Sequence, residues 1–106
     1  MILHCVFCHF REDATAAQRA EILHELSVFA KGLPGVLAFE FGPNRDFEQK
    51  SPAYGEGFVV RFQDRAALEH YAVHPSHQAL GQRLCGLCEG GGDGIIVFDL
   101  DVSKAV

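Results

Sequence analysis

The stretch HCVFCH, residues 4–9, decides the fold, because it reads either as a cysteine–histidine motif or as a β-strand. In a strand, Cys5 and Cys8 are three positions apart and point to opposite faces of the sheet. They then cannot share one metal ion or form one disulfide. Zinc knuckles place their Cys-x-x-Cys on a tight turn, and Val6-Phe7 does not suit such a turn. The stretch is therefore predicted to be a strand.

A second Cys-x-x-Cys, Cys85 to Cys88, falls near the end of the chain. These two cysteines are predicted to share one helix face, but two ligands seldom hold a structural zinc ion. Neither pair opens a helix, which is where thioredoxin-like redox motifs lie. The four cysteines are expected to be reduced and mostly buried. No cofactor is expected and no residue is assigned to a metal; a site built from His4, His74 or His77 with a carboxylate is the least favoured alternative.

The order of the predicted elements points to one fold. Thr15 and Gln18 read as a capping box that opens the first helix, and Gly32 ends it. Asp64 and Pro75 each start a later helix. The predicted strands cover residues 2–10, 36–41, 58–62 and 95–102, the last helix covers residues 75–87, and a loop covers residues 42–57. Strand, helix, strand, strand, helix, strand is the split βαβ order of a ferredoxin-like α+β fold, an antiparallel sheet with its helices on one face.

Both faces of this sheet are predicted to be apolar. A sheet with helices on one side and water on the other alternates apolar and polar residues. Here apolar residues occupy both parities: Cys5 and Phe7 oppose Val6 and Cys8, Leu37 and Phe39 oppose Val36 and Ala38, and Ile96, Phe98 and Leu100 oppose Ile95 and Val97. The helices cover one face, and the chain has no further element for the other. We expect a homodimer in which two sheets meet.

Size and charge restrict the function. The chain has 106 residues, 22% of them charged, and a net charge of −5 with scattered basic residues. This composition predicts one globular domain over residues 1–106 and argues against nucleic acids and anionic membranes as partners. No apolar run is long enough to span a membrane, and the N-terminus does not resemble a signal peptide. A cytoplasmic protein is expected.

Four polar residues are candidates for chemistry. Tyr71 and His77 flank a junction between two helices that Pro75 bends, so their side chains can converge. His4 projects from the first strand, and Asp99 is an acid on an otherwise apolar face of the last strand. A carboxylate that orients an imidazole makes it a better general base. The alternatives stay open: a histidine that fills the junction, a core tyrosine, and an acid on an exposed edge strand.

The sequence resembles the stress-responsive A/B barrel (Dabb) family of dimeric α+β barrels. The resemblance runs from about His4 to Asp101 and is most specific in FQDRAALEHYAVHPSHQAL, residues 62–80, followed by IIVFDLD, residues 95–101. The family includes a plant cyclase that makes olivetolic acid, and Tyr71 and His77 match its catalytic pair. By the same resemblance His4 and Asp99 lie beside this pair. The resemblance also implies a pocket between helices and sheet lined by four residues: Cys8, Ile22, Leu26 and Phe58.

Two functions remain open from the sequence. The first is a cofactor-independent lyase, cyclase or isomerase that acts on a small, partly apolar carbonyl compound. His77 would be the general base, oriented by Asp99 where the geometry allows, and Tyr71 would donate to the developing oxyanion. The second is a non-catalytic dimer that binds a small apolar ligand or confers stress tolerance. Family resemblance does not name a substrate.

Overall fold

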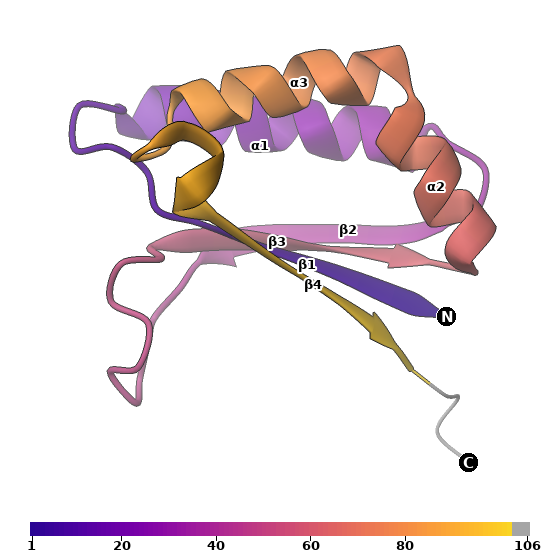
Figure 1. Cartoon of the computed structure of the whole chain (residues 1–106), viewed down its shortest axis with the longest axis horizontal. Coiled ribbons are helices and arrows are strands. Elements are labelled where there is room, and N and C mark those ends of the chain that lie inside the picture. Colours follow the sequence, from indigo (N-terminus) through magenta and orange to yellow (C-terminus); the bar gives the residue numbers. More distant parts are fainter. Residues whose placement is uncertain (103–106) are drawn as a thin grey trace.

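A computed structural model describes residues 1–102 of the chain. It shows one sheet with the helices on a single face (Figure 1). The last four residues of the predicted 1–106 domain lie outside the described part. In chain order the elements are β1 (Ile2–Cys8), α1 (Ala16–Lys31), β2 (Val36–Pro43), β3 (Glu56–Phe62), α2 (Arg65–Val73), α3 (Pro75–Gly86), a 3₁₀ helix (Gly91–Gly94) and β4 (Ile95–Asp101).

The sheet confirms the ferredoxin-like fold. Its strand order is β2-β3-β1-β4, and all neighbouring strands are antiparallel. Val6 lies opposite Phe58 on β3 and Val97 on β4. These three residues, one from each strand, therefore lie on the same face of the sheet, the face toward the helices. The loop between β2 and β3 is shorter than predicted, because β2 continues to Pro43 and β3 begins at Glu56.

Strand β2 departs from the predicted alternation. Its register with β3 shifts between Val36, opposite Phe62, and Ala38, opposite Arg61. Leu37 is therefore an extra residue in a bulge, and Val36 and Phe39 share the helix-facing side. The predicted pairing of Leu37 with Phe39 on one face, opposing Val36 with Ala38, is wrong for this reason. An inserted residue reverses the parity that follows it.

Local sequence explains where the helices begin. The Thr15 hydroxyl accepts from the Gln18 backbone N–H at 3.1 Å, and the Gln18 side chain accepts from the Thr15 N–H at 2.9 Å. This is the predicted capping box. Asp64 caps α2 by accepting from the Ala67 N–H at 2.9 Å.

The turn before β2 requires a glycine. Gly35 has a φ of +82°, and a Cβ there would lie 2.5 Å from that of Ala67, so only glycine fits this turn.

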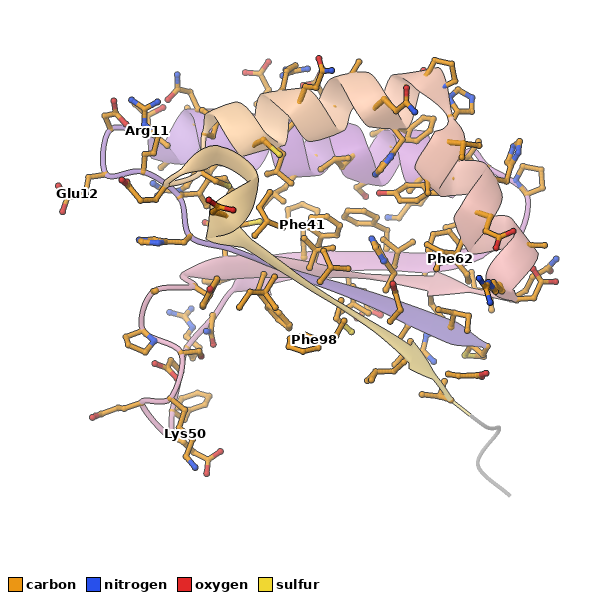
Figure 2. The ribbon with its side chains drawn as sticks, viewed as in Figure 1. Arg11, Glu12, Phe41, Lys50, Phe62 and Phe98 are labelled. Atoms are coloured by element: carbon orange, nitrogen blue, oxygen red, sulfur yellow. The ribbon has the colours of Figure 1, made fainter. Side chains whose placement is uncertain are left out.

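The core lies between the helices and the sheet. Its members are all buried apolar residues: Val6, Cys8, Ile22, Leu23, Leu26, Ala30, Phe39, Phe58, Val60, Phe62, Ala67, Tyr71, Leu84 and Cys88. On the opposite face β4 leaves large apolar side chains uncovered, and Phe98 and Leu100 are 53% and 50% exposed. Figure 2 shows Phe98 on this side of the sheet and Phe62 on the helix side. The sheet is therefore apolar on both faces, as the strand patterns predict.

The cysteines follow the strand interpretation of HCVFCH. Cys8 is fully buried among core residues, and Cys5 lies opposite Phe98 on β4. Cys88 does not share a helix face with Cys85, because α3 ends at Gly86 and Cys88 forms a β-bridge with Phe10. A hydrogen bond with the Cys88 thiol, together with burial, raises the pKa of Cys8. All four thiols are free.

The described residues contain neither a group of metal ligands nor a membrane-spanning helix. Within residues 1–102, no three His, Cys, Asp or Glu side chains are grouped so that they could hold a metal ion. The helices in this range are also too short or too polar to cross a bilayer.

Candidate functional site

Tyr71, in α2, is the centre of the candidate site. Its side chain is only 1% exposed. The ring stacks on Phe29 with centroids 5.9 Å apart and packs on Phe62 at 5.3 Å. Two imidazoles flank it, His77 at 4.3 Å and His4 at 6.0 Å between ring centroids. The fold thus brings two of the other three predicted polar residues against this buried ring.

The Tyr71 hydroxyl is buried and has no hydrogen-bond partner among the protein groups of residues 1–102. Within residues 1–102, one other buried side-chain oxygen shares this state, Glu56 Oε2, and it lies 3.5 Å from Arg19 Nε. A buried hydroxyl without a partner is costly in a native protein and calls for a functional or solvent explanation. Burial also raises the pKa of Tyr71, so the phenol keeps its proton and can donate a hydrogen bond.

One hydrogen bond sets the tautomer of His77 and leaves its other ring nitrogen as an acceptor. Its Nδ1–H donates to the Ala72 carbonyl at 3.1 Å. A carbonyl oxygen can only accept, so Nδ1 carries the proton and Nε2 of the neutral ring is the free basic nitrogen. Burial lowers the pKa of His77, the Ala72 bond opposes this, and the nearby imidazoles of His4 and His74 add to the lowering. The ring is therefore neutral near pH 7, as a general base must be.

The bend between α2 and α3 frees the Ala72 carbonyl. In a continuous helix this oxygen would accept from the Ser76 N–H, four residues on. Here that N–H donates to His74 Nδ1 at 3.1 Å, because His74 caps α3 and Pro75 occupies its first position. The carbonyl is then available to His77. The sequence His-Pro-x-His contains this signal, but the sequence prediction missed both the cap and the carbonyl.

Asp99 pairs with His4. The two residues lie opposite each other on β4 and β1, and His4 Nδ1 donates to Asp99 Oδ1 at 2.6 Å. The expectation that Asp99 orients His77 is therefore wrong: the sheet register places Asp99 opposite His4, which it orients, whereas the Ala72 carbonyl orients His77. The His4 side chain is 14% exposed and that of Asp99 is 47% exposed. The cluster thus runs from the buried Tyr71 outward to the edge strand β4, where solvent reaches it.

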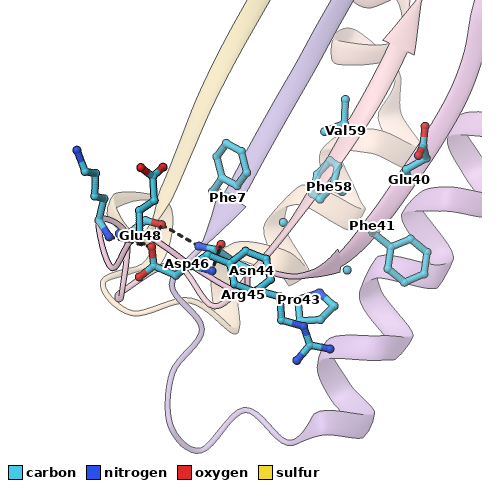
Figure 3. Close-up of a pocket in the computed structure, with 15 residues that line it drawn as sticks. Phe7, Glu40, Phe41, Pro43, Asn44, Arg45, Asp46, Glu48, Phe58 and Val59 are labelled. Atoms are coloured by element: carbon cyan, nitrogen blue, oxygen red, sulfur yellow. Dashed lines mark hydrogen bonds between the residues drawn. The ribbon is translucent and has the colours of Figure 1, made fainter.

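The four residues predicted to line a pocket lie in the core. They are 0–4% exposed and form part of one apolar cluster: Cys8, Ile22, Leu26 and Phe58. Phe58 stacks on Phe39 with centroids 5.0 Å apart. Their role in lining a ligand pocket stays a prediction. A cavity of about 670 Å³ lies beside the β2–β3 loop, and Phe58 lines it together with Phe7, Phe41 and Val59, whereas Cys8, Ile22 and Leu26 are not among its lining residues (Figure 3).

The arrangement has a definite chemical capacity. A phenol that keeps its proton and can donate, and an imidazole whose unprotonated nitrogen can accept, belong to rings that pack against each other at the edge of an apolar core. A second imidazole, fixed by a carboxylate, lies on the solvent side. Such a set can polarise a carbonyl oxygen and move a proton without a metal ion or an organic cofactor.

Comparison with solved structures shows that the chain is similar to proteins of ferredoxin-like fold, some of which are described as dimeric. A dimeric ferredoxin-like protein of unknown function from Jannaschia sp. CCS1 is 44% identical, with a TM-score of 0.89 over 95% of this chain and 98% of that one. The hydroxynitrile lyase of Passiflora edulis is 13% identical, with a TM-score of 0.83 over 99% and 95% of the two chains.

A cofactor-independent oxygenase from Streptomyces nogalater, SnoaB, is 10% identical, with a TM-score of 0.78 over 99% of this chain and 95% of that one. At these low identities the two enzymes share the fold alone. No curated protein matches the sequence. The sequence model of the stress responsive A/B barrel domain matches residues 2–102. The chain therefore belongs to the stress-responsive A/B barrel domain family.

Proposed function

We propose that this protein is a cofactor-independent acid–base catalyst that acts on a small, partly apolar carbonyl compound. One observation carries the proposal: the buried Tyr71 hydroxyl has no partner, and it belongs to a ring in contact with the His77 imidazole. A substrate oxygen would supply the missing acceptor. The aromatic rings of Phe29 and Phe62 hold Tyr71 in place, so the donor needs no reorganisation when charge develops.

The proposed reaction has two simultaneous parts. Tyr71 donates a hydrogen bond to the substrate carbonyl oxygen, and His77 Nε2 removes a proton from the adjacent carbon. The electron pair moves onto the oxygen as an enolate, which the phenol hydrogen bond stabilises. The resulting His77 imidazolium returns the proton to product, so the protein is unchanged over the cycle. The His4–Asp99 pair positions a second imidazole at the solvent side of the same substrate.

The comparisons support this class of chemistry. A hydroxynitrile lyase and a cofactor-independent oxygenase are built on the same fold. The pair of Tyr71 and His77 gives this chain the donor and the acceptor that the proposed carbonyl compound needs.

Exchange of carbon-bound hydrogen tests the proposal directly. Acetophenone in deuterated buffer is a suitable probe, because its methyl protons lie next to a carbonyl and NMR records their loss. We expect exchange above the buffer rate with the unmodified protein. Tyr71→Phe and His77→Gln should each lower the rate at least tenfold, whereas His24→Gln, on the exposed side of α1, should leave it unchanged. Mandelonitrile is the second substrate in the panel, and the absorbance of the benzaldehyde released measures its cleavage.

A substrate that binds with no turnover in any variant would favour the non-catalytic, ligand-binding function instead. Exchange that survives both Tyr71→Phe and His77→Gln would contradict the proposed site.

We also infer that the protein is a homodimer joined through the helix-free face of the sheet. Phe98 and Leu100 are about half exposed there, and Cys5, Phe7 and Ile96 belong to the same face. A contiguous apolar face of this kind usually marks an interface. The 44% identical Jannaschia protein is described as dimeric, which supports the same assembly here.

A further inference from the structure

The loop between β2 and β3, residues 44–55, projects from the sheet on the side opposite the helices (Figure 1). It carries Phe47, whose side chain is 91% exposed. The next most exposed large apolar side chain in residues 1–102 is Val73, at 68%. A phenylalanine this exposed makes few contacts within its own chain, so it contributes little to the stability of the monomer.

Hydrogen bonds fix the loop that carries Phe47. Asp46 Oδ1 accepts from the Lys50 N–H at 2.9 Å, and from the N–H and hydroxyl of Ser51 at 3.0 Å each. The Asp46 N–H in turn donates to Asn44 Oδ1 at 2.9 Å (Figure 3). Asp46 and Gln49 both adopt positive φ, at 46° and 57°. Backbone strain of this kind persists only where the surroundings determine it, so these bonds define the backbone of the loop on both sides of Phe47.

A groove of about 470 Å³ lies between this loop and the helix-free face of β4. Its floor is apolar and consists of Phe7, Ile96 and Phe98. The Phe7 ring lies against Gly57 of the neighbouring strand, where a Cβ would be only 2.7 Å from the ring. The wall of the groove is formed by four residues of the loop: Asn44, Lys50, Ser51 and Tyr54.

We propose that the β2–β3 loop is a reciprocal clasp of the homodimer, in which Phe47 of the partner subunit packs on the floor formed by Phe7, Ile96 and Phe98. This inference rests on the sheet-face dimer proposed above. A two-fold interface places the same surface on both subunits, so one chain must offer both an anchor and its receptor. This chain has both on the same side of the sheet.

A second copy suits the groove better than another occupant. The chain's own Phe47 is almost fully exposed, so it does not fill this space itself. The groove is continuous with the Phe98 and Leu100 surface assigned to the dimer. Buried aromatic anchors at the centre of an interface account for much of its binding energy. The clasp therefore adds to the dimer an anchor that the flat sheet face lacks.

Sedimentation velocity across a concentration series measures the dimer dissociation constant of four proteins: the unmodified chain, Phe47→Asp, Phe98→Asp and Val28→Asp. Val28 is 60% exposed on α1, on the helix side, and is the matched control. We expect Phe47→Asp and Phe98→Asp each to raise the dissociation constant at least tenfold. Val28→Asp should leave it unchanged. Circular dichroism verifies that each variant is folded.

The outcomes separate the clasp from the interface. If Phe98→Asp dissociates the dimer and Phe47→Asp does not, the sheet-face dimer stands and the clasp is overturned. If neither variant changes the dissociation constant, the interface lies elsewhere and both inferences fail. Phe47→Leu, which keeps an apolar side chain, should restore most of the affinity if the contact is a packed anchor. A Phe47→Leu protein as weak as Phe47→Asp would contradict that packing.

Discussion

Asp99 accepts a 2.6 Å hydrogen bond from His4 Nδ1 across the antiparallel strands β4 and β1. The two residues are 95 positions apart in sequence, and the sheet register alone places them opposite each other. The pair stands at the solvent edge of a cluster whose buried end is the Tyr71 hydroxyl. This arrangement connects the topology of the fold with the chemistry proposed for the site.

In Asp99→Ala, the His4 ring should no longer be restricted to one tautomer. With Asp99 present, the neutral ring keeps its proton on Nδ1; without it, the ring is free to exchange that proton between its nitrogens. Two-dimensional ¹⁵N NMR of the imidazole nitrogens reports the change. Asp101→Ala is the control, because Asp101 lies opposite Ile2 on the same strand pair. An unchanged His4 spectrum in Asp99→Ala would show that the carboxylate does not fix the ring.

Tyr71→Phe should not destabilise the fold. The hydroxyl makes no hydrogen bond, so its removal loses none and relieves the cost of burying a polar group. We expect the free energy of unfolding to stay the same or rise by up to about 1 kcal/mol. Tyr71→Ala, which also removes the ring, should cost about 3–5 kcal/mol. Denaturant titration measures both, and a loss of more than about 1 kcal/mol in Tyr71→Phe would mean that the hydroxyl has a structural partner.

Acidification should destabilise the protein through His77. Its pKa is lowered in the folded state, chiefly by burial. Below the ordinary histidine pKa of about 6.5, the unfolded chain therefore binds a proton that the folded chain resists. This contribution to stability is complete above pH 6.5 and is lost as the pH falls toward the folded-state pKa.

Melting temperatures measured between pH 5 and pH 8 test the effect. The unmodified protein should melt at a lower temperature below pH 6.5, and His77→Gln should show a smaller decrease. The exposed His24→Gln is the control and should keep the full decrease. Equal decreases in the unmodified protein and His77→Gln would assign the effect to other groups.

Leu26→Ala separates a packed core from an open pocket. Leu26 is 1% exposed in the central cluster, so truncation should cost about 2–5 kcal/mol of unfolding free energy. A side chain that lines a solvent-filled pocket would cost less, since water already fills its surroundings. Val28→Ala, at an exposed position on the same helix, should change stability by no more than about 0.5 kcal/mol. Chemical denaturation of both variants decides between the two.

Much of the fold was predictable because its signals are local. The capping box at Thr15, the cap at Asp64 and the strand reading of HCVFCH depend on residues a few positions apart, and the structure confirms each. The apolar residues on both strand parities correctly indicated a sheet that is apolar on both faces. The β2 bulge was not predictable, because a single extra residue at Leu37 leaves no mark in an apolar strand.

The sequence indicated which polar side chains lie close together, but not how they are hydrogen-bonded, and their role in a functional site stays a prediction. The helix junction at Pro75 correctly indicated that Tyr71 and His77 converge. Which acceptor orients which imidazole depends on the sheet register, which joins distant residues, and on one carbonyl freed by the bend, whose His-Pro-x-His signal the sequence prediction missed. Asp99 therefore bonds to His4, and His77 bonds to Ala72.

The central claim is that a carbonyl oxygen supplies the missing partner of Tyr71. A crystal structure of the protein soaked with acetophenone tests it most directly. We expect the ketone oxygen within hydrogen-bond distance of the Tyr71 hydroxyl and the methyl carbon next to His77 Nε2. Acetophenone bound only elsewhere, with the Tyr71 hydroxyl bonded to a protein group, would contradict the account.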